Sequence, residues 1–279
     1  MKTARHLYPQ LMDRLFRKPL VITVSRHREL VRILESRLVS ESPEPTVTIQ
    51  TEDDNDEDDF QKVGPDMVIP VHGVIVPHAE DIPMSTCGCG LDMVSAMIDE
   101  GLADPEVEKL VFDFRTPGGS ITGVPEIARK IGAITSKMTV GFTDDECCSA
   151  GVWMATQCQH FYCTQSASVG SIGVWSAYSD LSRALAMEGE NIQAISAGKY
   201  KLLGAYWKPL SSEEVAMLQQ DIDKWYEEFK GAVNSRREIA DKYMQGQIFS
   251  GDEAVEIGLC DGLVEGLDEL LYTVEKESE

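Results

Sequence analysis

From residue 67 onward, short apolar runs alternate with stretches of helical periodicity, and this alternation limits the folds that are open to the chain. The apolar runs of strand type are residues 67–76, 109–114, 138–142, 160–163, 169–174 and 191–196. The helical stretches between them are residues 90–100, 123–136, 149–158 and 181–188. Alternation of this kind predicts a layered α/β fold, in which helices cover a largely parallel sheet.

The last part of the chain has a different pattern. Residues 211–243 form one long helical stretch. Ser211 and Glu214 at its start fit a capping box, in which each side chain accepts a hydrogen bond from the other residue's backbone. Residues 248–271 return to short helices and strands.

Composition divides the chain into four parts. Residues 26–38 carry apolar side chains at helical spacing, and residues 52–59 are almost entirely acidic. A block of like charge favours a solvated, disordered segment. The predicted parts are an N-terminal arm with a short amphipathic helix, an acidic disordered linker, the main domain and a charged tail, at residues 1–45, 46–65, 66–272 and 273–279.

The overall charge excludes several classes of partner. The chain of 279 residues has a formal net charge of -22, which disfavours binding to nucleic acid or to an anionic membrane surface. We expect no transmembrane segment, because no apolar stretch is long enough to span a bilayer. The first 20 residues lack the apolar core of a secretory signal peptide. The seven cysteines fit no disulfide framework, so we expect reduced thiols and a cytoplasmic location.

Three short segments carry the residues that acyl transfer needs. Thr116-Pro117-Gly118-Gly119 follows a predicted strand, and paired glycines there let backbone N–H groups face a ligand. Ser149 stands at the start of an apolar helix, where free N–H groups favour developing negative charge. Lys201 follows the last predicted strand and supplies an amine that acts as a general base once burial makes it neutral.

Each segment also has a simpler interpretation. Ser149 is of the type that caps helix N-termini, and Pro117-Gly118 is a common turn dipeptide. Lys201 reads equally as a solvated surface lysine, and two neighbouring lysines compete for its role, Lys199 and Lys208.

Other catalytic arrangements remain open. A serine–histidine–aspartate triad would draw on His72, His78 or His160, but no Gly-x-Ser-x-Gly elbow is present. Cys148 is an alternative nucleophile, although small apolar packing suits it better. Cys87-Gly88-Cys89 could contact a metal, but no second cysteine pair at zinc-finger spacing accompanies it.

The order and spacing of the motifs resemble the signal peptide peptidase A family of serine–lysine peptidases, including phage-encoded relatives. The matching region runs from about residue 67 to residue 271. Its segments are Thr116-Pro117-Gly118-Gly119, Ser149-Ala150-Gly151, Gly170-Ser171-Ile172-Gly173-Val174, Gly198-Lys199-Tyr200-Lys201 and Gly246-Gln247-Ile248-Phe249-Ser250-Gly251.

The resemblance implies a Clp/crotonase-type fold, a spiral of strand–strand–helix units, with residues 66–272 as the peptidase domain. It implies that Ser149 is the nucleophile, that Lys201 is the general base and that Ser171 orients the lysine amine. The expected activity is ATP-independent hydrolysis of flexible peptides or unfolded proteins through an acyl-enzyme.

The resemblance also implies an oxyanion hole and an assembly. The hole would be formed by the backbone N–H groups of Gly119 and Ala150, with Gly118 shaping it. No metal or organic cofactor is implied. The partners are a peptide or unfolded protein substrate and further copies of the chain in a ring-shaped homo-oligomer, without nucleic acid.

The chain departs from the family pattern at three points. Thr116 stands where serine is usual, Gln247 stands where many members have arginine, and the family's membrane anchor is missing. The missing anchor favours a soluble, prophage-encoded peptidase over one that works within a membrane.

Three alternatives of different kinds compete with this interpretation. The first is a phage head-maturation protease. The second is a catalytically inactive scaffold or assembly module of the same fold. The third is a crotonase-like acyl-CoA enzyme that uses Gly118 and Gly119 to hold a thioester oxygen; it has no role for Lys201, and acidic chains suit CoA phosphates poorly.

Overall fold

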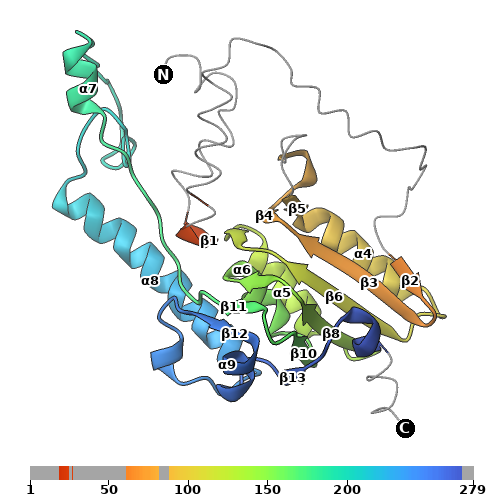
Figure 1. The fold of residues 1–279 in the computed structure, drawn as a ribbon. Helices are drawn as coiled ribbons and strands as arrows, with labels where there is room; N and C mark the ends of the chain where they lie inside the picture. Colours follow the sequence, from red (N-terminus) through yellow and green to blue (C-terminus); the bar gives the residue numbers. More distant parts are fainter. Residues whose placement is uncertain (1–18, 25–26, 28–60, 82–87, 272–279) are drawn as a thin grey trace.

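The computed structural model describes residues 19–24, 27, 61–81 and 88–271 (Figure 1). The predicted amphipathic helix at residues 26–38, apart from His27, lies outside the described residues. The acidic run at residues 52–59, Cys87 and the charged tail at residues 273–279 also lie outside them.

A six-stranded sheet forms the centre of the molecule, in the order β13-β10-β8-β6-β3-β2. Its neighbours pair in parallel, except that β2 is antiparallel to β3. The strands are β2 (Gln61–Val63), β3 (Asp66–His72), β6 (Lys109–Arg115), β8 (Met138–Thr143), β10 (His160–Cys163) and β13 (Gly262–Leu263). Apolar side chains dominate β3, β6 and β8, as expected for strands with cover on both faces.

Three central strands, β3, β6 and β8, are each followed by one or two short strands and then by a helix. The units are β3, β4 (Val74–Val76), β5 (Gly88–Gly90) and α4 (Leu91–Ala103); β6, β7 (Gly118–Ser120) and α5 (Val124–Gly132); and β8, β9 (Glu146–Cys148) and α6 (Ala150–Ala155). This repetition confirms the predicted α/β architecture of strand–strand–helix units.

The second strands form two smaller sheets. One has the order β1-β7-β4-β5 and the other β12-β11-β9, where β1 is Leu20–Ile22, β11 is Ser168–Gly170 and β12 is Ile248–Ser250. A bridge between Thr116 and Cys147 joins the β6–β7 connection to β9. β1 and β2 lie in stretches assigned to the arm and the linker, and both pair with strands of the main body.

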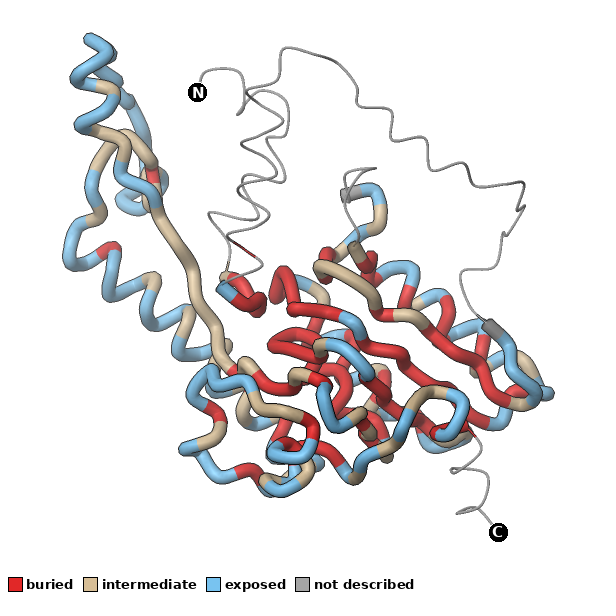
Figure 2. Tube along the Cα trace, viewed as in Figure 1, coloured by how far each residue is buried: buried red, intermediate tan, exposed pale blue. Residues whose placement is uncertain are grey.

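Two apolar clusters cover the faces of the central sheet. The larger joins Phe112 and Phe114 of β6 to helices α4, α5 and α6. The ring of Trp153 stacks on Phe229 of α8 (Ser212–Asn234), with 4.6 Å between ring centroids. The smaller cluster lies on the other face, where Leu270 and Leu271 cover Val68, Val111, Val140 and Phe142. Figure 2 shows this buried interior as a continuous body.

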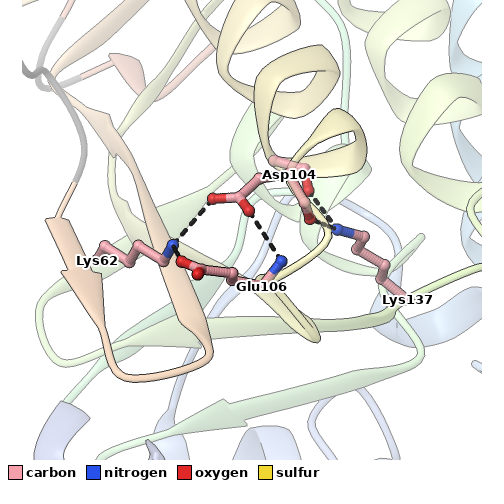
Figure 3. Close-up of polar contacts among 5 residues, drawn as sticks. Lys62, Asp104, Glu106 and Lys137 are labelled. Atoms are coloured by element: carbon pink, nitrogen blue, oxygen red, sulfur yellow. Dashed lines mark hydrogen bonds and ion pairs between the residues drawn. The ribbon is translucent and has the colours of Figure 1, made fainter.

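Ion pairs and hydrogen bonds of lysine side chains lie at the end of the central sheet where β6 and β8 begin. Lys62 Nζ lies 2.9 Å from carboxylate oxygens of both Asp104 and Glu106 (Figure 3). Lys137 donates to the backbone oxygens of Gly101 and Asp104. The candidate site motifs follow the opposite ends of these parallel strands, so these ion pairs have a structural role.

Most of residues 171–211 project from the body between β11 and α8, as Figures 1 and 2 show, although Ile172 remains in the main apolar cluster. They include α7 (Ser182–Met187), which has no buried residue. Two strand predictions are wrong here. The strand at residues 169–174 ends at Gly170, because Ser171 turns the chain with φ 58°. Residues 191–196 form no strand; Ile195 is 97% exposed, so no neighbouring strand pairs there.

The last helices follow the sequence pattern closely. The predicted capping box of Ser211 and Glu214 is present at the start of α8. α8 ends at Asn234, earlier than the predicted residue 243, and a 3-10 turn follows at Asp241–Tyr243. α9 (Gly251–Glu256) follows β12. Among the described helices, none has the length and apolar composition that crossing a membrane requires.

Candidate functional site

Ser149 lies between β9 and α6, in a backbone conformation that is unusual for a serine. Its φ is 57° and its ψ is -113°, and the residue is only 1% exposed. Its backbone N–H donates to Gly170 O at 2.8 Å. It occupies the N-cap position of α6, yet its side chain makes no capping hydrogen bond. Strained backbone of this kind concentrates at functional sites, so capping alone does not explain this serine.

Two glycines of β7 lie against Ser149 and the neighbouring backbone. Gly118 has φ 96°, and a Cβ added there would lie 2.9 Å from Ser149 Cβ. A Cβ added to Gly119 would lie 1.9 Å from the carbonyl oxygen of Ile75. Side chains are therefore excluded at both positions, and backbone approaches backbone beside the serine.

The N–H group of Gly118 has a hydrogen-bond partner within the chain. Gly118 N–H donates to Thr116 Oγ1 at 3.1 Å, and the Thr116 hydroxyl donates to Gly73 O at 2.6 Å. Because Gly118 N–H already donates to this hydroxyl, Gly118 fits the expectation that it shapes the oxyanion hole without donating a hydrogen bond to the oxyanion. Thr116 fills this position through its hydroxyl, so the replacement of serine by threonine keeps the contact.

Ser171 is held next to Ser149 by the pairing of β9 with β11. Cys148 and Gly170 are partners in this parallel pair, and Ser149 and Ser171 follow them directly. Ser171 has φ 58°, and its N–H donates to Gln247 O at 2.5 Å. The Gln247 side chain is used locally, since its Nε2 donates to Lys242 O at 2.7 Å. Gln247 therefore has a structural role where the family pattern has arginine.

Lys201 is not part of this cluster in the single chain. It lies on the projecting segment and is exposed. Its two competitors are engaged, since Lys199 pairs with Glu213 and Lys208 Nζ lies 2.6 Å from Glu214 Oε1. Hydrogen bonding to Glu213 raises the pKa of Lys199, which makes that amine a poorer base. Among the three lysines, the geometry leaves Lys201 as the one without a carboxylate partner in the described part of the chain.

Three of the other candidate catalysts have distinct surroundings. Burial raises the pKa of Cys148 to about 12, which keeps its thiol protonated and unreactive at neutral pH. His72 Nε2 lies 2.8 Å from Asp113 Oδ2, and His78 Nδ1 lies 3.7 Å from Asp92 Oδ2. The six described cysteines are all buried and unbridged, as predicted for reduced thiols. Within the described residues, no three metal-ligating side chains are grouped to hold an ion.

Sequence reasoning missed one neighbour of the site. β1 pairs with β7 in antiparallel fashion, with Val21 opposite Gly119. The run Leu20-Val21-Ile22 is apolar and rich in β-branched side chains, which is the usual strand signal. Its short length and its position within a basic arm concealed that signal.

The model of peptidase family S49 matches residues 135–279, which is more than half of the chain. The chain belongs to this family. The matched S49 region includes Ser149, Ser171 and Lys201, whereas Gly118 and Gly119 precede it.

Curated relatives of this S49 chain include phage proteins and a bacterial protease. The chain is 29% identical to the capsid assembly protease C of Escherichia phage lambda over 205 residues, 72% of this chain and 47% of the relative. It is 28% identical to the head-tail preconnector protein GP5 of Enterobacteria phage P21, over 72% of this chain and 41% of the relative. It is 27% identical to protease 4 of Salmonella typhi, over 70% of this chain and 32% of the relative. The chain therefore spans less than half the length of these three relatives.

Proposed function

We propose that this chain is an ATP-independent serine endopeptidase that cleaves flexible peptides or unfolded proteins through an acyl-enzyme. The observation that carries the proposal is the setting of Ser149. Its backbone is strained at φ 57°, its hydroxyl caps no helix, and Gly118 excludes any side chain from its immediate contact. Membership of peptidase family S49 supports the same chemistry.

The proposed reaction has two halves. Ser149 Oγ attacks the peptide carbonyl and gives its proton to the neutral amine of Lys201, which passes it to the leaving amine. Water then attacks the resulting ester, again with Lys201 as the base, and Ser171 orients the amine. The backbone N–H groups of Gly119 and Ala150 would stabilise the oxyanion. Removing one such donor typically slows catalysis by about a hundredfold or more.

We further propose that the chain forms a homo-oligomer in which Lys201 serves the Ser149 of a neighbouring copy. The segment that bears Lys201 extends away from its own body (Figure 1), and a lysine acts as a base only where water is excluded. The same segment exposes Met187 and Ile195, which are 90% and 97% exposed. Covering these apolar side chains would favour association.

The activity can be tested by intact-mass spectrometry of casein incubated with the protein. Fragments from the wild type, with none from Ser149→Ala at equal concentration, are expected. The fragment ends would show whether small or apolar residues precede the cut. Undiminished cleavage by Ser149→Ala would exclude this serine as the nucleophile.

The shared site can be tested by mixing two inactive variants. When Ser149→Ala and Lys201→Ala chains are unfolded together and reassembled, mixed oligomers are expected to regain part of the activity. Recovery requires that one copy supplies the serine and another the lysine. No recovery, despite mixed oligomers detected by mass, would mean that each copy uses its own lysine.

A phage assembly role is the second candidate. Similarity to a capsid assembly protease and to a head-tail preconnector protein favours structural proteins of a phage particle as the substrates. The test is co-expression with the coat and scaffolding proteins of the same genome. Processing that depends on Ser149 would support this role, and unprocessed particles of normal composition would exclude it.

A further inference from the structure

β1 is hydrogen-bonded on both of its edges, although it is only a short strand from the N-terminal arm. On one edge it pairs with β7, with Val21 opposite Gly119. On the other edge Leu20 and Trp175 exchange both backbone hydrogen bonds, at 2.8 Å and 3.1 Å. Trp175 Nε1 also donates to Ile22 O at 2.8 Å.

The two flanking segments both come from the candidate active site. β7 carries Gly118 and Gly119, and Trp175 lies four residues after Ser171. β1 therefore fills a slot between the glycine strand and the segment that leaves Ser171. Figure 1 shows β1 lying next to the body.

The carbonyl group of Val21 lies against the glycine next to the nucleophile. A Cβ added to Gly118 would lie 2.1 Å from Val21 O and 2.9 Å from Ser149 Cβ. The Val21 carbonyl and the Ser149 side chain thus meet at the same glycine. With β1 in this position Ser149 is only 1% exposed, so a substrate cannot reach it.

We propose that the slot is the peptide-binding groove of the enzyme, and that β1 occupies it as an inhibitory pseudo-substrate. The inference rests on the proposed peptidase function of Ser149. A substrate would bind as an added strand, with main-chain hydrogen bonds to β7 on one side and to residue 175 on the other. Activity would then require displacement of β1.

Val21 indicates what the groove accepts. Its side chain is fully buried and belongs to the main apolar cluster, together with Cys147 and Ile172. Because Val21 stands opposite Gly119, it takes the place of the residue whose carbonyl is attacked. The groove is therefore specific for a small apolar side chain at that position and excludes a charged one.

The groove can be tested without catalysis, in the full chain carrying Ser149→Ala. The probe is a fluorescent peptide of residues 18–24, Lys-Pro-Leu-Val-Ile-Thr-Val. Adding Val21→Pro removes the backbone N–H that faces β7 and should release β1. Peptide binding is then expected to tighten at least tenfold relative to Ser149→Ala alone.

Val24→Pro is the matched control, because Val24 follows β1 and is 53% exposed. It should leave peptide binding at the level of Ser149→Ala. Leu20→Glu is the second test variant, since a buried carboxylate would also expel β1. Equal peptide binding by the closed and released forms would overturn the proposal. Unfolding of both variants would also overturn it, because β1 would then be part of the body.

Measurements of activity test the proposal independently of peptide binding. In the chain with Ser149 intact, Val21→Pro should raise kcat/KM for an apolar peptide substrate about tenfold, and the probe peptide should compete with that substrate. A loss of activity in a folded Val21→Pro chain would count against the inhibitory role. If the peptide binds as expected but no variant cleaves anything, the groove stands and the proposed peptidase function fails.

Discussion

Ser149 is buried where several strands and a helix start meet, whereas Lys201 is exposed on a segment that projects from the body. The serine is held by the β9–β11 pair, by β7 and by the start of α6. The segment of the lysine includes a helix without a single buried residue. The chain thus builds the nucleophile half of its proposed site completely and leaves the base half to be positioned by something else.

This difference indicates how activity could be controlled. The backbone around Ser149 is already in place, so its geometry costs nothing at the moment of reaction. Under the proposed function the base requires assembly with further copies, and under the further inference the groove requires removal of β1. Two separate features would then lower the activity of the chain, and each can be removed by a different experiment.

The largest effect is expected from the lysines of the projecting segment. Lys201→Ala should lower kcat/KM by roughly a hundredfold to ten-thousandfold, which is the range for loss of a general base. Lys199→Ala is the matched control, because its amine pairs with Glu213 instead. It should retain activity within about threefold, since an exposed ion pair contributes little. A larger loss in Lys199→Ala than in Lys201→Ala would reverse the assignment of the base.

The pH dependence of activity separates a lysine base from a purely structural lysine. A lysine must lose its proton before it accepts one from Ser149, so kcat should rise as the pH increases from 6 towards 10, roughly tenfold per unit below the pKa of the base. Hydrogen bonding to Glu213 raises the pKa of Lys199, so this amine keeps its proton to higher pH than an unpaired lysine. Lys201→Arg should fold normally and lack the rise. A flat wild-type profile would argue against any lysine base.

Alanine substitutions at two glycines compare the packing next to Ser149 with the packing of the projecting segment. In Gly119→Ala the new Cβ would lie 1.9 Å from the Ile75 carbonyl oxygen, so β7 or β4 must move. We expect a loss of about 3 kcal/mol of stability. Gly198→Ala, on the projecting segment, meets nothing within 4 Å and suffers only from φ 95°. Its cost should be about 1 kcal/mol. Denaturant titration of the two variants measures both losses of stability. Equal losses would mean that the two glycines are equally tightly packed, contrary to the prediction.

The sequence predicts the strands around Ser149 better than it predicts the projecting segment, for a physical reason. Buried strands and their glycine turns leave strong local patterns, so β3, β6, β8 and the Ser149 turn were all placed correctly. Residues 191–196 have the apolar composition of a strand, but a strand also needs a neighbour with which to pair. Their apolar side chains are exposed in the single chain, and no local pattern distinguishes a buried strand from a surface that other copies would cover.

The pairing of β1 illustrates the same limit at longer range. Leu20 and Trp175 are far apart in sequence, and nothing in either stretch indicates that they meet. Under the proposed function, the position of Lys201 also depends on further copies of the chain. Motif order identified Ser149, Ser171 and Lys201 as candidates, whereas the spatial separation of the lysine from the two serines became visible only in the structure.

Substitution of the exposed apolar side chains of the projecting segment tests whether this segment holds the copies together. Met187→Ser and Ile195→Ser should leave the thermal stability of the body unchanged, because both side chains are almost fully exposed. Together they should shift the oligomer towards smaller species in sedimentation velocity and lower the activity in parallel. Val215→Ser, on exposed α8, serves as the control. Unchanged assembly in the double variant would remove this segment as the contact between copies.

The smallest effect is expected next to the nucleophile itself. Cys148 precedes Ser149, and burial raises the pKa of its thiol to about 12. The reactive thiolate is therefore scarce below that pH, and iodoacetamide at pH 8 should leave Cys148 unmodified while the protein is folded. Cys148→Ala should keep activity within about threefold, with a stability loss of about 1 kcal/mol for the smaller buried side chain. Peptide mapping after alkylation gives the first result and a casein assay the second. Rapid alkylation of Cys148 with loss of activity would make this cysteine a competing nucleophile. It would also remove the difference between the buried surroundings of Ser149 and the exposed segment of Lys201, because the residues next to Ser149 would then be accessible to solvent.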